Sequence, residues 1–145
     1  MKKEQGKKVN WGDMGIILTL IAMIIFFSVV TKSFLSAKNF ANIARQISIT
    51  GICSVGMTMV ILTGGIDLSI GSVIGFTSAV AALMMSNGQP IILASVVSLA
   101  LGVIIGVINA TCINYLQIPA MIATLGTQIS LRGAVYLVTG GMPVY

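Results

Sequence analysis

The sequence predicts an all-α membrane protein, a polytopic transmembrane helix bundle with about five apolar segments and a break at residues 64–67. Hydrophobic residues make up 57% of the chain and charged residues only 8%, whereas soluble domains carry about 25% charged residues. Apolar runs of about 20 residues, the length that crosses a bilayer, recur along the chain. Asp67 and Arg132 are the only charged residues after Arg45. The length of 145 residues allows one such domain.

The composition also excludes several classes of function. The formal net charge is +5, but four of the eight basic residues lie within the first ten residues and form no basic face with interleaved aromatic residues. The chain has no histidine, the commonest general base and metal ligand. Cys53 and Cys112 stand apart in apolar runs, so they are expected to be small packing residues. We therefore predict no catalytic residue, no metal site, no bound cofactor and no nucleic-acid partner.

The first element is a basic tail over residues 1–13, followed by an apolar run over Met14–Val30. The run is long for a secretory signal and no A-x-A-like cleavage site follows it, so we expect a transmembrane helix with Trp11 as its interfacial anchor. The lysines of the tail favour a cytoplasmic N-terminus, although Lys32, Lys38 and Arg45 at the other end of this helix oppose that bias.

Residues 31–46 form the longest polar connection, and two interpretations of it are open. Phe34, Leu35, Phe40 and Ile43 could lie along the membrane interface as a short amphipathic segment, or the stretch could be a solvated loop. The second and third apolar runs follow, over residues 47–63 and 68–85, and only four residues separate them. These four form either a tight hairpin at the surface or a break inside a protein-lined cavity.

Asp67 is the most informative residue of this break. A carboxylate near hydrocarbon is costly unless water, a partner or backbone donors reach it. Gly64 and Gly65 allow the backbone to leave helical geometry, and Asp67 is then placed to cap the helix that follows. One interpretation limits Asp67 to capping, and the other has the break line a polar pathway, as broken helices do in transporters.

Small residues recur at intervals of four in two of the apolar runs. Gly71 and Gly75 are followed by Ala79, and Gly102 and Gly106 are followed by Ala110. Such spacing lets helices approach closely, so the third and fourth runs are expected to pack through these glycines. The turn over residues 86–90 separates the two runs, and the fourth run covers residues 91–115.

Polar side chains mark the last two runs. Asn109 and Asn114 could bond across helices or face a pathway. The fifth run, over residues 120–138, carries Arg132, which must reach an interface, a water-filled space or an acid. Asp67 is the only acid in the apolar part of the chain, so an Asp67 to Arg132 pair is one hypothesis and extension of the arginine to the interface is the other.

The segment over residues 60–72, with the letters VILTGGIDLSIGS, resembles the signature of permease subunits in ribose-type bacterial sugar ABC importers. Further family-like segments are Asn39-Phe40-Ala41-Asn42-Ile43, residues 119–126 and Leu131-Arg132-Gly133, so the resemblance covers about residues 39–144. It implies that residues 14–145 are the N-terminal part of a permease domain about twice as long. The candidates for lining its pathway are Gly64, Gly65, Asp67, Ser69, Gly71 and Ser72.

The resemblance implies a multi-pass subunit of the bacterial plasma membrane, embedded in lipid, that forms part of a translocation pathway for a sugar or similar small polar solute. Its implied partners are a second permease subunit, a cytoplasmic ATP-binding protein that hydrolyses ATP, and an extracytoplasmic sugar-binding protein. No G-x-x-x-x-G-K-[ST] phosphate loop occurs in the chain. Because the chain is expected to be truncated, an alternative function stays open, that of a small non-transporting membrane protein that packs on or regulates another membrane complex. An intramembrane enzyme is disfavoured because the chain lacks both a histidine and a second intramembrane carboxylate.

Overall fold

The computed structural model describes residues 11–144, with side chains from Met14 onward, and five α-helices make up most of this part of the chain. The basic tail predicted over residues 1–13 and the anchoring role of Trp11 lie outside the described side chains. The helices are α1 (Trp11–Val30), α2 (Ala37–Leu62), α3 (Ile70–Ser86), α4 (Ile91–Asn114) and α5 (Ala120–Thr139). The predicted all-helical membrane fold is therefore confirmed.

The helices differ in how readily they span a bilayer. By length and composition, α2, α4 and α5 are long and apolar enough to cross a membrane, whereas Met14–Val30 and Ile70–Ser86 are shorter apolar helices. At 1.5 Å per residue the 17 residues of α3 extend about 26 Å, less than the roughly 30 Å of a hydrocarbon core. The chain divides into two compact units, residues 1–51 and residues 52–145, each with its own internal contacts.

In the first unit, α1 is followed by a short connection and the start of α2. The polar stretch expected over residues 31–46 is mostly helical, because α2 already begins at Ala37. Ser36 ends the connection and caps the helix: its Oγ accepts the Asn39 N–H at 3.2 Å, the bond typical of a serine N-cap. The Asn39 side chain donates back to the Phe34 carbonyl at 2.7 Å. Neither a separate interfacial segment nor a long loop forms here, since these caps start the helix early.

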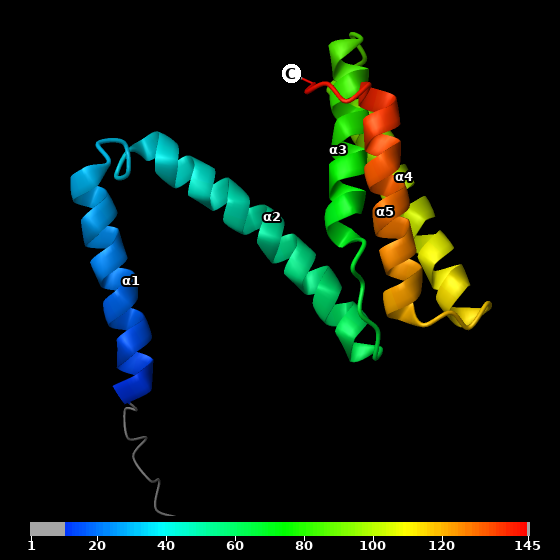
Figure 1. The fold of residues 1–145 in the computed structure, drawn as a ribbon. Coiled ribbons are helices and arrows are strands. Elements are labelled where there is room, and N and C mark those ends of the chain that lie inside the picture. The colour runs from blue at the N-terminus through cyan, green and yellow to red at the C-terminus, as the bar shows by residue number, and fades with distance from the viewer. Residues whose placement is uncertain (1–10, 145) are drawn as a thin grey trace, which may run out of the picture. The chain divides into compact units, whose positions relative to one another are not determined.

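In the second unit, α3 packs against both α4 and α5 (Figure 1). The connection over residues 87–90 reverses the chain between α3 and α4, with Gly88 in the left-handed region at φ +80°. Residues 115–119 connect α4 to α5. The three helices thus run alternately up and down, and the start of α3, the end of α4 and the start of α5 lie at one end of the bundle (Figure 1).

The interior of this bundle is unusually polar. Among the described residues, the buried apolar side chains are Ala94 and Ile105, whereas the buried polar ones are Ser69, Ser72, Asn109 and Thr124. Most large apolar side chains are exposed, as expected for helices that face lipid. Lipid removes the hydrophobic drive between helices, so close contacts and interhelical hydrogen bonds must hold α3, α4 and α5 together.

The packing through the glycines stays a prediction, and within the described part of this chain the four glycines make no close contact. A Cβ placed at Gly71, Gly75, Gly102 or Gly106 would meet no atom within 4 Å. The helices α3 and α4 do pack, but through other residues: Ser98 Oγ donates to the Thr77 carbonyl at 3.0 Å, and Asn109 bonds to Ser69. These hydrogen bonds join the two helices, while the space directly beside the four glycines is open.

This open space makes a testable contrast between two glycines. Gly75→Ala should be tolerated or slightly stabilising, by up to about 1 kcal/mol, because alanine favours helices and the new methyl group meets nothing. Gly141→Ala should destabilise the end of α5, because Gly141 has φ +73° and its Cβ would lie 2.7 Å from the Tyr136 ring. Unfolding of each purified variant in detergent measures both effects, and a loss of stability in Gly75→Ala would show that this face is filled.

Candidate functional site: a pocket at the helix break

The break predicted between the second and third apolar runs is present and longer than expected. The helix α2 ends at Leu62 and α3 begins at Ile70, so residues 63–69 are not helical. Gly64 adopts φ +81°, a left-handed conformation that costs residues with a Cβ about 1–2 kcal/mol. The Gly64 and Gly65 N–H groups donate back to the Ile61 and Val60 carbonyls at 2.9 and 3.1 Å, which closes the end of α2.

Asp67 forms its hydrogen bonds with Ser69, the residue just before α3, and not with the first N–H groups of the helix itself. Its Oδ1 accepts both the Ser69 backbone N–H at 2.7 Å and the Ser69 hydroxyl at 2.6 Å. Ser69 is the N-cap residue of α3 and makes no side-chain cap bond itself. Asp67 therefore fixes the turn that leads into α3, and its contact with the helix passes through Ser69.

A row of buried polar groups ties this turn to α4 and α5. The Asn109 side-chain amide of α4 donates to Ser69 Oγ at 3.0 Å, and Thr127 of α5 donates its hydroxyl to Asn109 Oδ1 at 2.5 Å. Ser69 is 0% exposed and Asn109 only 6%. Hydrogen bonds thus run continuously from α5 through α4 to Asp67.

These bonds also give the depth of the break within the bundle. Asn109 lies five residues before the end of α4, and Thr124, which bonds to Leu68, lies four residues after the start of α5. At 1.5 Å per residue, Leu68 and Ser69 lie about 6–8 Å inside the ends of both helices. Of the two geometries left open by the sequence, the structure has the break inside the bundle.

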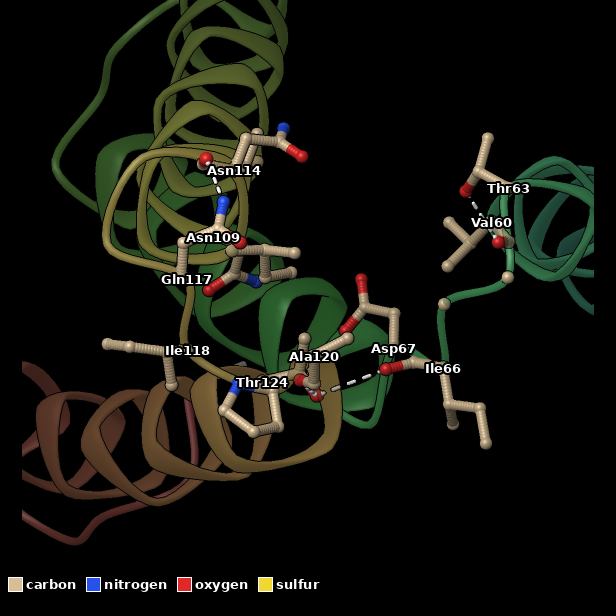
Figure 2. A pocket seen from close by; sticks show the side chains of 16 residues that line it. Val60, Thr63, Ile66, Asp67, Asn109, Asn114, Gln117, Ile118, Ala120 and Thr124 are labelled. Carbon is tan, nitrogen blue, oxygen red and sulfur yellow. Dashed lines mark hydrogen bonds between the residues drawn. The ribbon is translucent and has the colours of Figure 1, made fainter.

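An open pocket of about 600 Å³ adjoins the break. Its lining comes from the end of α2, the break, the end of α4 and the start of α5. Figure 2 shows the Asp67 carboxyl group between Val60 and Thr63 on one side and Asn109 and Asn114 on the other. The polar side chains that line the pocket are Thr63, Asp67, Asn109, Asn114, Gln117 and Thr124. Asn109 and Thr124 are buried and bonded to other protein groups. The carboxylate, the Asn114 and Gln117 amides and the Thr63 hydroxyl can therefore bond a solute that carries both donors and acceptors.

A second polar row lies along α5 and holds the backbone of the break. Thr124 Oγ1 accepts the Leu68 N–H at 3.2 Å and contacts the Ile66 carbonyl at 3.4 Å. With the Gln128 amide oriented to suit its neighbours, its nitrogen donates to the Leu68 carbonyl at 3.1 Å. Irregular backbone is tolerated at membrane depth where protein groups form hydrogen bonds with its N–H and C=O groups. We call the residues Thr124, Gln128 and Arg132 the α5 seam.

Arg132 completes the α5 seam and is not brought to Asp67. Its Nη2 donates to the Gln128 side-chain oxygen at 3.1 Å, so the guanidinium is bonded back along α5. Among residues 14–144 no ion pair joins Arg132 to Asp67. Instead, Arg132 lines a second pocket of about 430 Å³ with Gly71, Ser72, Gly75, Gln128 and Val135. Asp67 and Arg132, whose pairing was one of two hypotheses, therefore border two different pockets.

Thr124→Val should loosen the break while keeping the shape of the side chain. The Leu68 N–H loses its acceptor, which costs about 1–2 kcal/mol, so exchange of the Leu68 amide hydrogen should accelerate by roughly tenfold or more. Thr139→Val is the matched control, since the Thr139 hydroxyl bonds only to the Val135 carbonyl within its own helix. Equal exchange at Leu68 in both variants would contradict the assigned role.

The residues predicted to line a pathway do not all border the same pocket. Gly64, Gly65 and Asp67 line the first pocket, Gly71 and Ser72 line the second, and buried Ser69 lies behind Asp67. Thr124, Thr127 and Gln128 were missed as site residues. Their signal is a spacing of three or four residues, which places polar groups on one face of an otherwise apolar helix.

This chain is similar to known transport permeases. Residues 39–143 match the family described as "Branched-chain amino acid transport system / permease component". The chain is 42% identical over 127 residues to the ribose import permease of Haemophilus influenzae, which covers 88% of this chain and 39% of that protein. It is 38% identical over 140 residues to the xylose transport system permease of Escherichia coli, covering 95% of this chain and 36% of that protein. No solved structure matches the chain.

Proposed function

We propose that this chain, which belongs to the family described as "Branched-chain amino acid transport system / permease component", forms part of a translocation pathway for a sugar or similar small polar solute, as its similarity to ribose and xylose permeases supports. The chain is a multi-pass protein of the bacterial plasma membrane. It spans about two fifths of the length of the curated relatives it matches. The proposal therefore concerns a complete permease in which this segment supplies the break and its pocket.

The observation that carries the proposal is the polar pocket at the break inside an apolar bundle. Donors and acceptors from the end of α2, the break, the end of α4 and the start of α5 border one open space of about 600 Å³, large enough for a small polar solute. Broken helices that present polar groups to a cavity are the usual solute sites of membrane transporters. A bundle with only a structural role would gain little from placing Asp67 beside such a space.

The proposal extends to the partners of the complete permease. A second permease subunit, a cytoplasmic ATP-binding protein and an extracytoplasmic sugar-binding protein would act with it, and ATP would be hydrolysed by the partner rather than by this chain. The basic tail over residues 1–13 would lie in the cytoplasm, and residues 14–145 would belong to the permease domain. Gly64, Gly65 and Asp67 would line the pathway, and Ser69 would hold Asp67 in place.

A hybrid permease tests this function directly. The segment of the Haemophilus influenzae ribose permease that aligns with this chain is replaced by this chain's sequence, and ribose uptake is measured in cells lacking their own permease. We expect uptake to persist, since the exchanged segments are 42% identical. A hybrid that reaches the membrane and assembles with its ATP-binding partner but transports no ribose or xylose would overturn the proposal and favour a non-transporting role.

A further inference from the structure

The hydrogen bonds in the buried row from α5 through α4 to Asp67 all have the same direction. Thr127 donates to Asn109, the Asn109 amide nitrogen donates to Ser69, and Ser69 donates to Asp67. Each hydroxyl has one proton, and an amide oxygen can only accept. Once Asn109 Oδ1 accepts from Thr127, its nitrogen faces Ser69, and the Ser69 proton is left for Asp67. Every donor in the row therefore points toward the carboxylate.

The row ends on one oxygen of Asp67. Oδ1 accepts two bonds, from the Ser69 N–H and the Ser69 hydroxyl. Within residues 14–144 no protein donor reaches Oδ2, and the carboxyl group borders the first pocket (Figure 2). The two oxygens of one side chain thus have different tasks. One anchors the carboxylate to the bundle, and the other is an acceptor open to the pocket.

We infer that Ser69, Asn109 and Thr127 are positioning residues that hold Asp67 so that Oδ2 accepts a hydrogen bond from a donor group of the solute, such as a sugar hydroxyl. The inference rests on the proposed transport function. Ser69 and Asn109 are nine-tenths or more buried, so a solute in the pocket meets them mainly through Asp67. Without the row, the carboxylate could rotate and turn the bonded oxygen away from Ser69.

The first test follows Asp67 itself and requires no transport. The chain contains only two aspartates, Asp13 and Asp67. Aspartate labelled at the carboxyl carbon therefore gives two resonances in nanodiscs, which the Asp13→Asn variant assigns. We expect Ser69→Ala and Thr127→Val to shift the Asp67 resonance, and Thr127→Ser to restore it. Thr111→Val is the control, because the Thr111 hydroxyl bonds only within α4 to the Val107 carbonyl and lines neither pocket.

The second test measures uptake in the hybrid permease described above. Thr127 lies three hydrogen bonds away from Asp67. Thr127→Val should raise the solute concentration at half-maximal uptake by about three- to tenfold, the effect of a weakened bond to a charged acceptor. Membrane levels and the maximal rate should change less, and Thr127→Ser should restore the affinity. A role in stability alone would lower the amount of folded protein without moving the half-saturating concentration.

The two tests separate failure of the inference from failure of the proposed function. An unchanged Asp67 resonance in folded Thr127→Val protein would overturn the positioning role, whether or not the hybrid transports. A shifted resonance with an unchanged half-saturating concentration in an active hybrid would overturn the contact between Oδ2 and solute. An inactive hybrid would refute the proposed function while the resonances still decide how Asp67 is held.

Discussion

Replacing Asn109 with leucine is expected to destabilise the bundle of α3, α4 and α5 by about 2 kcal/mol. The substitution removes two buried interhelical bonds at once, those to Ser69 and Thr127. Interhelical bonds in membrane proteins contribute about 0.6 kcal/mol on average and at most about 1.7, and a buried group left without its partner adds a further cost. Unfolding of the purified chain by denaturing detergent measures the change.

Asn114→Leu is the matched control for this prediction. Asn114 lies on the same helix and lines the same pocket, but its side chain is exposed and makes no bond between helices in the described part of the chain. The control should therefore change stability by less than about 0.5 kcal/mol, as surface substitutions usually do. Equal losses in the two variants would mean that the buried row does not hold the three helices together.

Asp67→Asn should abolish most transport in the hybrid permease while leaving the fold intact. The asparagine Oδ1 can still accept the Ser69 N–H and hydroxyl, so the turn into α3 is preserved. The charge is lost, and the acceptor at Oδ2 becomes a donor. A hydrogen bond to a charged group contributes about 1.5–3 kcal/mol, so uptake should fall by roughly ten- to a hundredfold.

Comparison with Asp67→Ala separates the two roles of this side chain. Alanine removes the capping bonds as well as the charge and should cost about 0.5–2 kcal/mol in stability. Membrane levels of the hybrid permease and its uptake are measured for both variants. If Asp67 serves only as a cap, the asparagine variant should transport normally and only the alanine variant should fail. Normal uptake in the Asp67→Asn variant would therefore contradict a role of Asp67 in the pathway.

The sequence predicted the five helices well because their signal is local. Apolar length and the turn at Asn87-Gly88 place α3, α4 and α5 within two residues of their observed bounds. The start of α2 was missed by ten residues. Lys38 and Arg45 make the first turns of α2 look like a polar loop, whereas the Ser36 cap and the intrinsic helix preference of these residues start the helix earlier.

The site was predictable only in part, since its contacts join residues far apart in sequence. Asp67 and the two glycines stand out as a polar interruption in an apolar chain. Nothing local indicates that Asn109 meets Ser69 from 40 positions away or that Thr124 meets Leu68 from 56. The predicted glycine packing is equally non-local, and within this chain these glycines border open space. Small-residue spacing shows that a helix face can be approached closely, but it does not show which face the neighbour takes.

The α5 seam limits how the length of this chain can vary. Its members Thr124, Gln128 and Arg132 bond on one face of a helix because they are four residues apart. One residue inserted between Thr124 and Gln128 would rotate everything after it by about 100° and direct Gln128 away from Leu68. The connection over residues 87–90 carries no such constraint, because none of its side chains lines either pocket. Insertions and deletions should therefore accumulate at residues 87–90 and be excluded from residues 124–132 of α5.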